Sequence, residues 1–513
     1  ELLPPPQFSR EGGPYTESFQ LTLESEPGSM IYYTLNGQIP TSSSGILYTT
    51  PINISSTDIV RARAYKQGYM PSEPKTMIYS RIGSNVQGFK SNLPVVILHQ
   101  FNTAITPGAR TPAAAVFIDN NQGDTTHLIG EIALQSRILA NIRGSSAQSF
   151  PKKMYGFHLV NEFDQDKDES LFEMPADNNW ILYAPYSDKS LMRNAIAYTL
   201  GAGFGKWAPR VRFVELFLHS GNGQVTNYHY HGVYVLVERI KWGEDRVNIT
   251  KLKPGDNLEP EISGGYIIKV DRLNDGEYGM TTNMGTLMAY VRPSEADATP
   301  AQKSWILNYM NDFESTLYSQ NFTDPQTGYQ AYIDVESFID HFLITELLKE
   351  IDGYRLSNFM YKDRNKKLVM GPVWDFNLSL GNANYMGGWQ PQGWYYTQLN
   401  ASNCYINCGV RDWYVRLMQD PVYMQKMRYR WWQLRQNLFS NQNLSNMIWQ
   451  FSDLLSEAQV RNFTRWPILG QYVWPNWYIA PTYQAELNWM NNWLMTRLAW
   501  IDSQMGEPPV FMD

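Results

Sequence analysis

Residues 346–381, ELLKEIDGYRLSNFMYKDRNKKLVMGPVWDFNLSLG, place polar side chains at the ends of strongly apolar runs. The apolar residues of 339–351 recur at helical spacing, which predicts an amphipathic helix that ends at Asp352-Gly353. Residues 358–370 then alternate around a turn at 363–366, which predicts a β-hairpin. The polar residues at these ends are Asp352, Asn358 and Asp375.

These three residue types, in this order, suit phosphoryl transfer assisted by a divalent cation. An acid, an amide six positions later, a hairpin and a second acid is also the order of parts in a kinase catalytic centre. There, one Asp orients the acceptor hydroxyl, while an Asn and a second Asp hold Mg²⁺ on the ATP phosphates. Mg²⁺ takes oxygen ligands and keeps several waters, so one carboxylate and one amide suffice when phosphates complete its shell. The structural alternative is a helix end, a turn amide and a surface acid.

Composition excludes two classes of protein. The chain has 513 residues, 43% hydrophobic and 18% charged, with a net charge of −7, and it is long enough for two or more domains. A mildly acidic chain without Lys/Arg runs lacks the electrostatic footprint of a nucleic-acid binder. No apolar run reaches the roughly 20 residues of a membrane helix. Aromatic residues make up 14% of the chain, which leaves carbohydrate contact and large aromatic cores both open.

Only two cysteines occur, Cys404 and Cys408 in NCYINC. At this spacing they can close a small disulfide loop in an oxidising compartment, and a pair of free, partly buried thiols is the alternative. A zinc site would need further ligands nearby in the sequence, and there are none.

Residues 1–82 differ in pattern from the rest of the chain. Short runs of alternating apolar and polar residues, separated by turn residues, predict a small β-sandwich. Their segments IYYTLNGQIP, LYTTPINI and VRARAYKQGYMPS resemble the immunoglobulin-like module found beside the catalytic domain of chitobiases and hexosaminidases. The resemblance implies an extracellular, modular protein in glycan-rich surroundings. It leaves the module open as either a spacer or a sugar binder.

From residue 91 to about residue 275, alternating patterns predict a strand-rich region. These strands lie in PAAAVFID, GEIALQSRILANIRG, MYGFHLV, VRFVELFLH, HGVYVLVERI and GGYIIKVD. One helix is predicted at 191–200, capped by Asp188 or Ser190. Helical periodicity returns in 411–460 and 482–505. Strands followed by helices predict an α+β fold, and two-lobed ATP-dependent transferases share this outline.

Several polar residues of the strand-rich region suit a polyanion. Arg143 ends a predicted strand and offers a planar fork for phosphate oxygens, and a Lys offers a compact point charge. A hairpin with solvated lysines is the alternative. Glu238 is either a surface acid or the carboxylate that holds a phosphate-binding Lys. The candidates for nucleotide binding in this region are Arg143, Ser145, Ser146, Lys152, Lys153 and Lys269, with Asp271 beside the last.

Five blocks occur in one order: RGSSAQSFPKK, WILYAPYSDKSLMRNAIAYTL, GVYVLVERI, GGYIIKVD, and IDGYRLSNFMYKD with GPVWDFNLSLG. Over roughly residues 90–385 they resemble the spore-coat CotH family of atypical secreted kinases. The resemblance implies a divergent, two-lobed protein-kinase-like fold that binds ATP with Mg²⁺ or Mn²⁺. It also implies a secreted or cell-surface enzyme that transfers phosphate to Ser or Thr of exported proteins.

The resemblance also implies roles for single residues. Asp352 would be the catalytic-loop acid, and Asn358 and Asp375 the metal ligands. Lys152 or Lys153, together with Arg143, would hold phosphates, and Glu238 would be the partner acid. Many members carry a second Asp two residues after the metal-binding one, where this chain has Asn377. An amide can still bind the metal, but the lost charge should weaken metal affinity.

The predicted organisation is a β-sandwich at 1–82, a kinase-like core at 90–385, and an aromatic loop with helices at 386–513 packed on that core. The aromatic loop is expected to cover the cleft or to receive the acceptor. The alternative function is a non-catalytic carbohydrate-binding or scaffold protein of an extracellular polysaccharide-degrading system. A glycoside hydrolase lacks an acid pair that spacing could assign. An ordinary protein kinase is excluded because the glycine-rich loop and the H-R-D triplet are absent.

Overall fold

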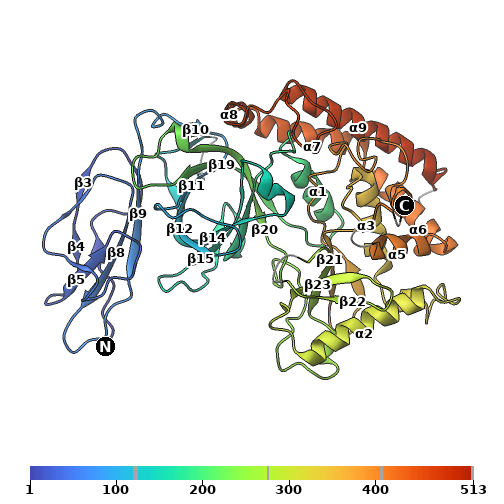
Figure 1. Ribbon diagram of the computed structural model, residues 1–513, viewed down its shortest axis with the longest axis horizontal. Coiled ribbons are helices and arrows are strands. Elements are labelled where there is room, and N and C mark those ends of the chain that lie inside the picture. The colour runs from blue at the N-terminus through green and yellow to red at the C-terminus, as the bar shows by residue number, and fades with distance from the viewer. Residues whose placement is uncertain (120–124, 274–276, 401, 405–407, 510–513) are drawn as a thin grey trace. The chain divides into compact units, whose positions relative to one another are not determined.

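The computed structural model describes residues 1–119, 125–273, 277–400, 402–404 and 408–509. Strands and helices are mixed, and the amino-terminal region is all-β, as predicted (Figure 1). The chain divides into two compact units. Unit 1 comprises residues 1–186, 211–239 and 454–467, and unit 2 comprises residues 187–210, 240–453 and 468–513. The finer prediction of a two-lobed, kinase-like arrangement stays a prediction.

Unit 1 begins with the β-sandwich. Its strands are β1 (Gln7–Phe8), β2 (Gly13–Tyr15), β3 (Phe19–Leu21), β4 (Leu23–Glu24), β5 (Met30–Thr34), β6 (Ile46–Leu47), β7 (Ile52–Ile54), β8 (Asp58–Tyr65) and β9 (Lys75–Arg81). The main sheet has the order β2-β9-β8-β5-β6, and β1 pairs with β4 and β3 with β7. Alternate residues such as Leu21, Ile54 and Val60 are fully buried between these layers, because successive side chains of a strand point to opposite faces.

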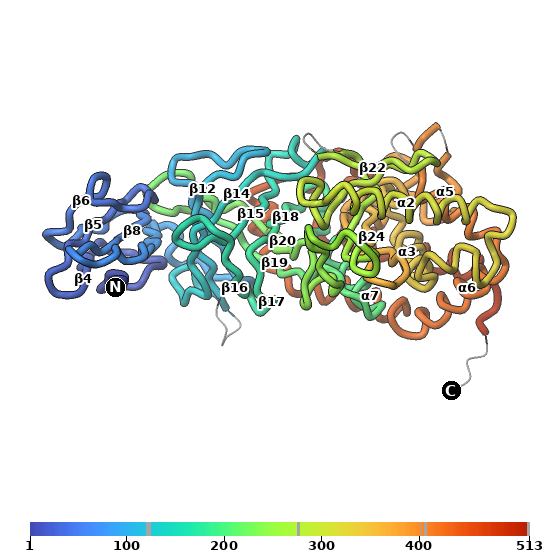
Figure 2. The backbone as a smooth tube through the Cα atoms, turned by 90° about the horizontal axis from the view of Figure 1, so that it is seen from below, coloured from blue at the N-terminus to red at the C-terminus, as the bar shows by residue number. Residues whose placement is uncertain are grey.

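The rest of unit 1 is built on a closed barrel. Its strands are β11 (Val95–His99), β12 (Thr111–Ile118), β14 (Ile132–Arg143), β15 (Met154–Val160), β18 (Asn179–Tyr183), β19 (Val211–His219) and β20 (Tyr230–Glu238). Figure 2 shows β12, β14 and β15 side by side. The parallel pairing of β11 with β19 closes the barrel in the order β11-β12-β14-β15-β18-β20-β19. The sequence predicted β12, β14, β15, β19 and β20 as strands, but neither β18 nor the closure of the barrel.

Two short strand pairs and a helix also belong to unit 1. The strand pairs are β10 (Lys90–Ser91) with β13 (Thr126–His127), and β16 (Glu169–Leu171) with β17 (Met174–Asp177). Helix α8 (Ala458–Arg465) packs against β20, although more than 200 residues separate them in the chain. The carboxy-terminal helical region therefore contributes one helix to the amino-terminal unit.

Unit 2 contains a five-stranded sheet and most of the helices. The sheet consists of β21 (Tyr266–Val270), β22 (Gly279–Thr281), β23 (Leu287–Arg292), β24 (Asn358–Lys362) and β25 (Leu368–Met370), in the order β22-β23-β21-β24-β25. The helices are α1 (Arg193–Ala202), α2 (Pro300–Leu317), α3 (Val335–Leu348), α4 (Tyr395–Gln398), α5 (Gly409–Leu417), α6 (Pro421–Arg435), α7 (Asn441–Leu454) and α9 (Tyr483–Met505). Helix α2 lies along the sheet (Figure 1), where Trp305 stacks on Tyr266 of β21.

Helix α3 is the buried centre of unit 2. It contacts α1, α6, α9 and β25, and all but its first two residues are buried. The predicted helix covered 339–351, but α3 begins earlier because Asp334 caps it by accepting a hydrogen bond from the Ser337 N–H at 2.9 Å. It also ends earlier, at Leu348. The predicted hairpin is confirmed as β24 and β25.

The structure also bears on the state of the two cysteines and on membrane-spanning helices. Cys404 and Cys408 form a disulfide, with their Cα atoms 5.6 Å apart, so the question that the sequence left open is resolved in favour of the bonded pair. Among the helices of the described part of the chain, none combines the length and the apolar character that crossing a membrane requires.

Buried histidines of unit 1 predict acid sensitivity. His219 at the end of β19 is buried, its Nδ1 lies 3.1 Å from Nδ1 of His99, and burial lowers the pKa of His219 to about 4. An unfolded chain binds this proton near pH 6.5, whereas the native protein binds it only near pH 4, so the free energy of unfolding falls as the pH drops through this window. For His219 alone the full loss is about 3 kcal/mol.

Denaturant unfolding at pH 7.5 and pH 5.0 checks this expectation. The His219→Gln variant should lose less stability on acidification than the wild type, while His127→Gln, at an exposed position, should lose as much as the wild type. Equal losses in all three proteins would contradict the role given to burial.

Candidate functional site

The turn that joins α3 to β24 carries the central candidates. Helix α3 ends because Lys349 adopts a left-handed conformation with φ of 49°. The buried ammonium of Lys349 donates hydrogen bonds to the carbonyls of Gln390 (2.8 Å) and Gln392 (2.9 Å). Burial lowers the pKa of Lys349 to about 7. This anchor fixes the chain immediately before Asp352.

Asp352 is mostly buried, with 23% of its side chain exposed. Its Oδ1 accepts a hydrogen bond from the guanidinium of Arg355 at 2.5 Å. Burial raises the pKa of the Asp352 carboxyl, the charges of Arg355 and Arg272 oppose the rise, and Asp271 adds to it. A carboxyl that is partly open to solvent and has a raised pKa is suited to accept a proton from a neighbouring hydroxyl.

Glu350 is a member of the site that the sequence reading missed. It is 2% exposed, and its Oε1 accepts a hydrogen bond from the Asp352 N–H at 3.1 Å. Its Oε2 is buried and has no hydrogen-bond partner among the described residues. Burial raises the pKa of Glu350 well above its ordinary value, and the charges of Asp352 and Asp375 add to the rise. Two further carboxyl groups, of Asp352 and Asp375, therefore act on Glu350.

Asn358 holds the turn together. It is 1% exposed and begins β24. Its Nδ2 donates to the carbonyl of Leu356 at 2.9 Å, and its Oδ1 accepts a long bond from the Tyr354 N–H at 3.3 Å. Because an amide oxygen has two lone pairs, Oδ1 keeps acceptor capacity beyond that one bond.

Side chains of α1 accept hydrogen bonds from the backbone at Asp375 and so fix its position. The residue is exposed and has a φ of 62°, a left-handed conformation that is uncommon for residues other than glycine. Its N–H donates to the hydroxyl of Tyr198 at 3.3 Å, and the next N–H, of Phe376, donates to Oδ1 of Asn194 at 2.7 Å. Both partners lie on α1, one turn apart. A positioned acid in an unusual conformation is a typical feature of functional sites.

Asn377 and Lys269 lie in the same unit as this cluster. Asn377 is partly exposed, and its carbonyl accepts a hydrogen bond from Nδ2 of Asn382 at 2.8 Å. Lys269 on β21 is paired with Asp271, with 3.2 Å between Nζ and Oδ2, and lies 3.9 Å from Glu277. Because Asp271 also acts on Asp352, Lys269 belongs to the charged surroundings of the candidate acid.

The predicted phosphate loop belongs to unit 1. Arg143 ends β14, Gly144 follows with a φ of 104°, and a short turn leads to β15. Ser145 and Ser146 are exposed in this turn. Lys153 donates from Nζ to the carbonyl of Gln148 at 2.7 Å, so it stays attached to the turn and keeps two further protons for a ligand.

Lys152, next to it, is fully engaged inside unit 1. Its ammonium is 1% exposed and donates to the carbonyls of Pro185 and Val233 and to Oδ1 of Asn462. These three acceptors use all three protons of the ammonium. A phosphate contact by Lys152 stays a prediction that requires this network to open, whereas Lys153 could make one without such a change.

Glu238, the predicted partner acid, is fully buried at the end of β20 opposite Trp180. Its role also stays a prediction. Within unit 2, the structure brings together Asp352, Asn358, Asp375 and Lys269. The predicted residues of unit 1 are Arg143, Ser145, Ser146, Lys152, Lys153 and Glu238.

Comparison with known proteins adds two findings to this geometry. A family model described as CotH kinase protein matches residues 140–501. The chain belongs to the CotH kinase family. A second model, the chitobiase/beta-hexosaminidase C-terminal domain, matches residues 10–76 within the β-sandwich. Both families and their order along the chain agree with the sequence analysis. No match was found among curated proteins.

The CotH match begins inside the barrel of unit 1 and extends to the last turns of α9. It therefore includes every candidate residue, from Arg143 to Asn377. Membership supports a kinase-like protein. The match also covers residues 386–501, which the sequence analysis placed after the core.

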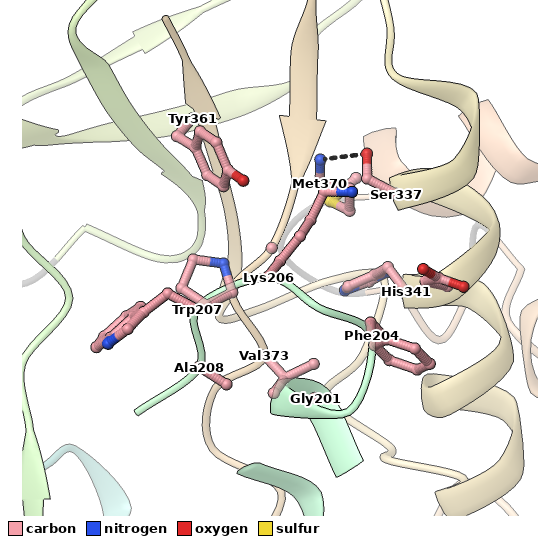
Figure 3. Close-up of a pocket in the computed structure, with 13 residues that line it drawn as sticks. Gly201, Phe204, Lys206, Trp207, Ala208, Ser337, His341, Tyr361, Met370 and Val373 are labelled. Atoms are coloured by element: carbon pink, nitrogen blue, oxygen red, sulfur yellow. Dashed lines mark hydrogen bonds between the residues drawn. The ribbon is translucent and has the colours of Figure 1, made fainter. Parts of the chain in front are cut away.

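A second feature of unit 2 is a small apolar pocket that none of the candidate residues lines. Figure 3 shows it between the end of α1, helix α3 and residues 371–373. Phe204, Trp207 and Val373 contribute apolar walls. The Ser337 hydroxyl accepts a hydrogen bond from the Met370 N–H at 3.0 Å beside it. This packing joins β25 to α3, which fixes the chain before it reaches Asp375.

Proposed function

We propose that this CotH-family protein is a secreted or cell-surface kinase that transfers the γ-phosphate of ATP to Ser or Thr of an exported protein, with Mg²⁺ or Mn²⁺. The observation that carries the proposal is the cluster of Glu350, Asp352 and Asp375, held beside Asn358 within the CotH match. The Cys404–Cys408 disulfide supports an oxidising location.

The residues fit a magnesium ion. Asp375 and Asn358 would hold it, since both supply hard oxygen ligands and Asn358 Oδ1 has acceptor capacity left. Burial raises the pKa of Glu350 first, and the charges of Asp352 and Asp375 add to the rise, so a cation there would favour the ionised form of this carboxyl. Groups of three or more Asp, Glu, His or Cys side chains that could hold a metal are absent from the described residues.

When bound, the ion would neutralise charge on the transferring phosphate. The chain's own residues would do the rest. Asp352 would orient the acceptor hydroxyl and take its proton, and Arg355 holds its carboxylate in place. Phosphate binding by Arg143 and Lys153 of unit 1 stays a prediction from the sequence. Because the transition state of phosphoryl transfer is loose, positioning and charge neutralisation supply most of the catalysis.

A non-catalytic carbohydrate-binding or scaffold function is the second candidate. It is favoured by the match of residues 10–76 to a domain of chitobiases and hexosaminidases, and by Asn377, which gives the metal site one acid fewer than many family members carry.

Thermal unfolding with ATP, with and without Mg²⁺, tests the proposal against the second candidate. A ligand at about 100 times its dissociation constant adds roughly 2.7 kcal/mol of stability. The wild type should therefore unfold at a higher temperature, and only when metal and ATP are both present. The Asp375→Ala variant should not respond. The control Asp312→Ala, at an exposed acid on α2, should respond like the wild type. No response in the wild type would favour the scaffold.

A further inference from the structure

Unit 2 carries an exposed cluster of aromatic rings on two loops that are distant in sequence. Its members, here called the aromatic patch, are Tyr385, Trp389, Tyr472, Trp474 and Trp477. Tyr472 is 54% exposed, and Trp474 and Trp477 are each 46% exposed. Single exposed aromatic residues are normal on protein surfaces, but three exposed rings within six residues concentrate apolar surface in the way that binding sites do.

The rings of the patch are stacked in pairs. The ring centroids of Trp389 and Trp477 lie 4.4 Å apart with planes at 15°, and those of Tyr385 and Trp474 lie 5.9 Å apart with planes at 14°. In each pair, one ring is half-buried and supports the other, which is exposed. Each exposed tryptophan thus has one partner ring and offers the remainder of its surface to solvent.

Backbone hydrogen bonds hold the two loops together. The N–H of Asn384 donates to the carbonyl of Pro475, and the N–H of Trp477 donates to the carbonyl of Asn382, each at 2.8 Å. The buried amide of Asn476 donates to Oδ1 of Asn382 at 2.8 Å. The rings are therefore positioned before any ligand arrives, which lowers the entropic cost of binding.

The two loops that carry the rings are polar but have no charged residue of their own, although the ammonium groups of Lys349 and Lys189 donate hydrogen bonds to their backbone at Gln390 and Gln471. Residues 376–410 and 466–485 contain no Asp, Glu, Lys or Arg. The Tyr472 hydroxyl lies at the edge of the patch, where it accepts a hydrogen bond from Nδ2 of Asn384 at 3.0 Å. Flat apolar faces with neutral hydrogen-bonding groups at their edges match a pyranose ring, which has C–H faces and hydroxyl edges. They do not match the phosphates of a nucleic acid or a charged peptide.

The patch adjoins the candidate acid. Gly388 lies in the same loop as Tyr385 and Trp389 and packs closely on Ile351. A Cβ atom added to Gly388 would lie 2.9 Å from Cγ2 of Ile351. The Leu380 N–H donates to the carbonyl of Leu348 at 2.8 Å. Asp352 and Glu350 act electrostatically on the phenol of Tyr385. A ligand on the patch would therefore lie near the turn that carries Asp352.

We propose that the aromatic patch binds a pyranose oligosaccharide, so that the CotH region has a glycan-docking surface of its own beside Asp352. This surface is separate from the chitobiase-type domain of unit 1 and does not depend on phosphate transfer. If the transfer activity is present, the patch would bring a glycan-bearing or glycan-bound acceptor to Asp352.

Calorimetric titration of the full chain with cellohexaose and with the hexamer of β-1,4-linked N-acetylglucosamine tests the proposal. The wild type should bind at least one of them, and the double variant Trp474→Ala, Trp477→Ala should bind it at least about tenfold more weakly, because two stacking surfaces are lost. Tyr429→Ala, at a ring 44% exposed on α6, is the matched control and should bind like the wild type. Asp375→Ala should also keep its affinity, which separates this proposal from the metal site.

Protection of tryptophans from chemical oxidation measures ligand binding on the wild type itself, so it does not depend on the folding of a variant. With the bound hexasaccharide, Trp474 and Trp477 of the wild type should be protected from tryptophan oxidation, as mapped by mass spectrometry. Three outcomes would overturn the proposal: no binding of either sugar by the wild type, equal affinity in the double variant, or protection confined to unit 1. Protection of the patch by a sugar-free peptide, with none by sugar, would assign it to polypeptides instead.

Discussion

Replacing Asp352 by asparagine is expected to lower the rate of phosphate transfer by about 10²–10⁴-fold while leaving Mg-ATP binding nearly unchanged. Asparagine has almost the same size as aspartate but cannot accept the hydroxyl proton. Asp352 is also not among the two residues assigned to the metal. The affinity for nucleotide should therefore survive, whereas the rate should not.

The measurement is a transfer assay with labelled ATP, with the protein itself and casein as acceptors, together with calorimetric titration of Mg-ATP. Asp312→Asn on α2 is the matched control, since it changes the same groups at an exposed position. An unchanged rate in Asp352→Asn would remove Asp352 from the mechanism. Loss of rate and nucleotide affinity in equal proportion would make it a binding residue instead.

Replacing Arg193 by methionine should destabilise unit 2 by about 3–5 kcal/mol. The Nη1 of Arg193 lies 2.6 Å from Asp188 Oδ1 and 2.9 Å from Glu486 Oε1, and its Nε donates to the carbonyl of Ser379 at 3.0 Å. All three charged side chains are almost completely buried. Removing the cation of this triad would leave two buried carboxyl groups without their ion-pair partner, with only the charge of Lys189 still acting on Glu486.

Denaturant unfolding followed by tryptophan fluorescence measures the change. Arg428→Met, at an exposed position of α6, is the control and should shift the transition little. Because Arg193 also holds Ser379, four residues after Asp375, the variant should lose Mg-ATP binding at temperatures where it is still folded. A shift no larger than that of Arg428→Met would show that the buried triad is not a main support of this unit.

Local patterns in the sequence predicted most of the secondary structure, because alternation and helical spacing report which face of an element is buried. Strands such as β12, β14 and β19 were expected from alternation alone. Closure of the barrel was not, because it depends on pairing Val95 with Glu215 across 120 residues of chain. No local pattern encodes a contact between such distant segments.

The candidate site was predicted only in part, for the same reason. Asp352, Asn358 and Asp375 were identified from their order along one stretch of chain. Glu350 was read as part of the preceding helix, and only the left-handed Lys349 that ends α3 turns it toward Asp352. The α1 residues that hold the Asp375 segment could not be found, since they lie about 180 residues earlier.

Lys152 shows a different weakness of predicting a site from local sequence, because a residue can be made a candidate although the fold buries it. In the sequence it stands beside Lys153 as an equivalent candidate for phosphate, because neighbouring lysines after a Gly-Ser turn look alike. The structure separates the two through Asn462 on α8, which accepts from the Lys152 ammonium at 2.9 Å and lies 310 residues away. Burial, rather than residue type, decides which lysine remains open to a ligand.

The most direct test of the central claim follows the γ-phosphate itself. The wild-type protein would be incubated with ATP whose γ-phosphate carries ¹⁸O, with Mg²⁺ or Mn²⁺, in the presence of exported proteins, and all proteins would then be examined by mass spectrometry. If the protein is a kinase, ¹⁸O-labelled phosphate is expected on Ser or Thr, and only when metal is present. Bound nucleotide with no labelled Ser or Thr in any protein would contradict the kinase proposal.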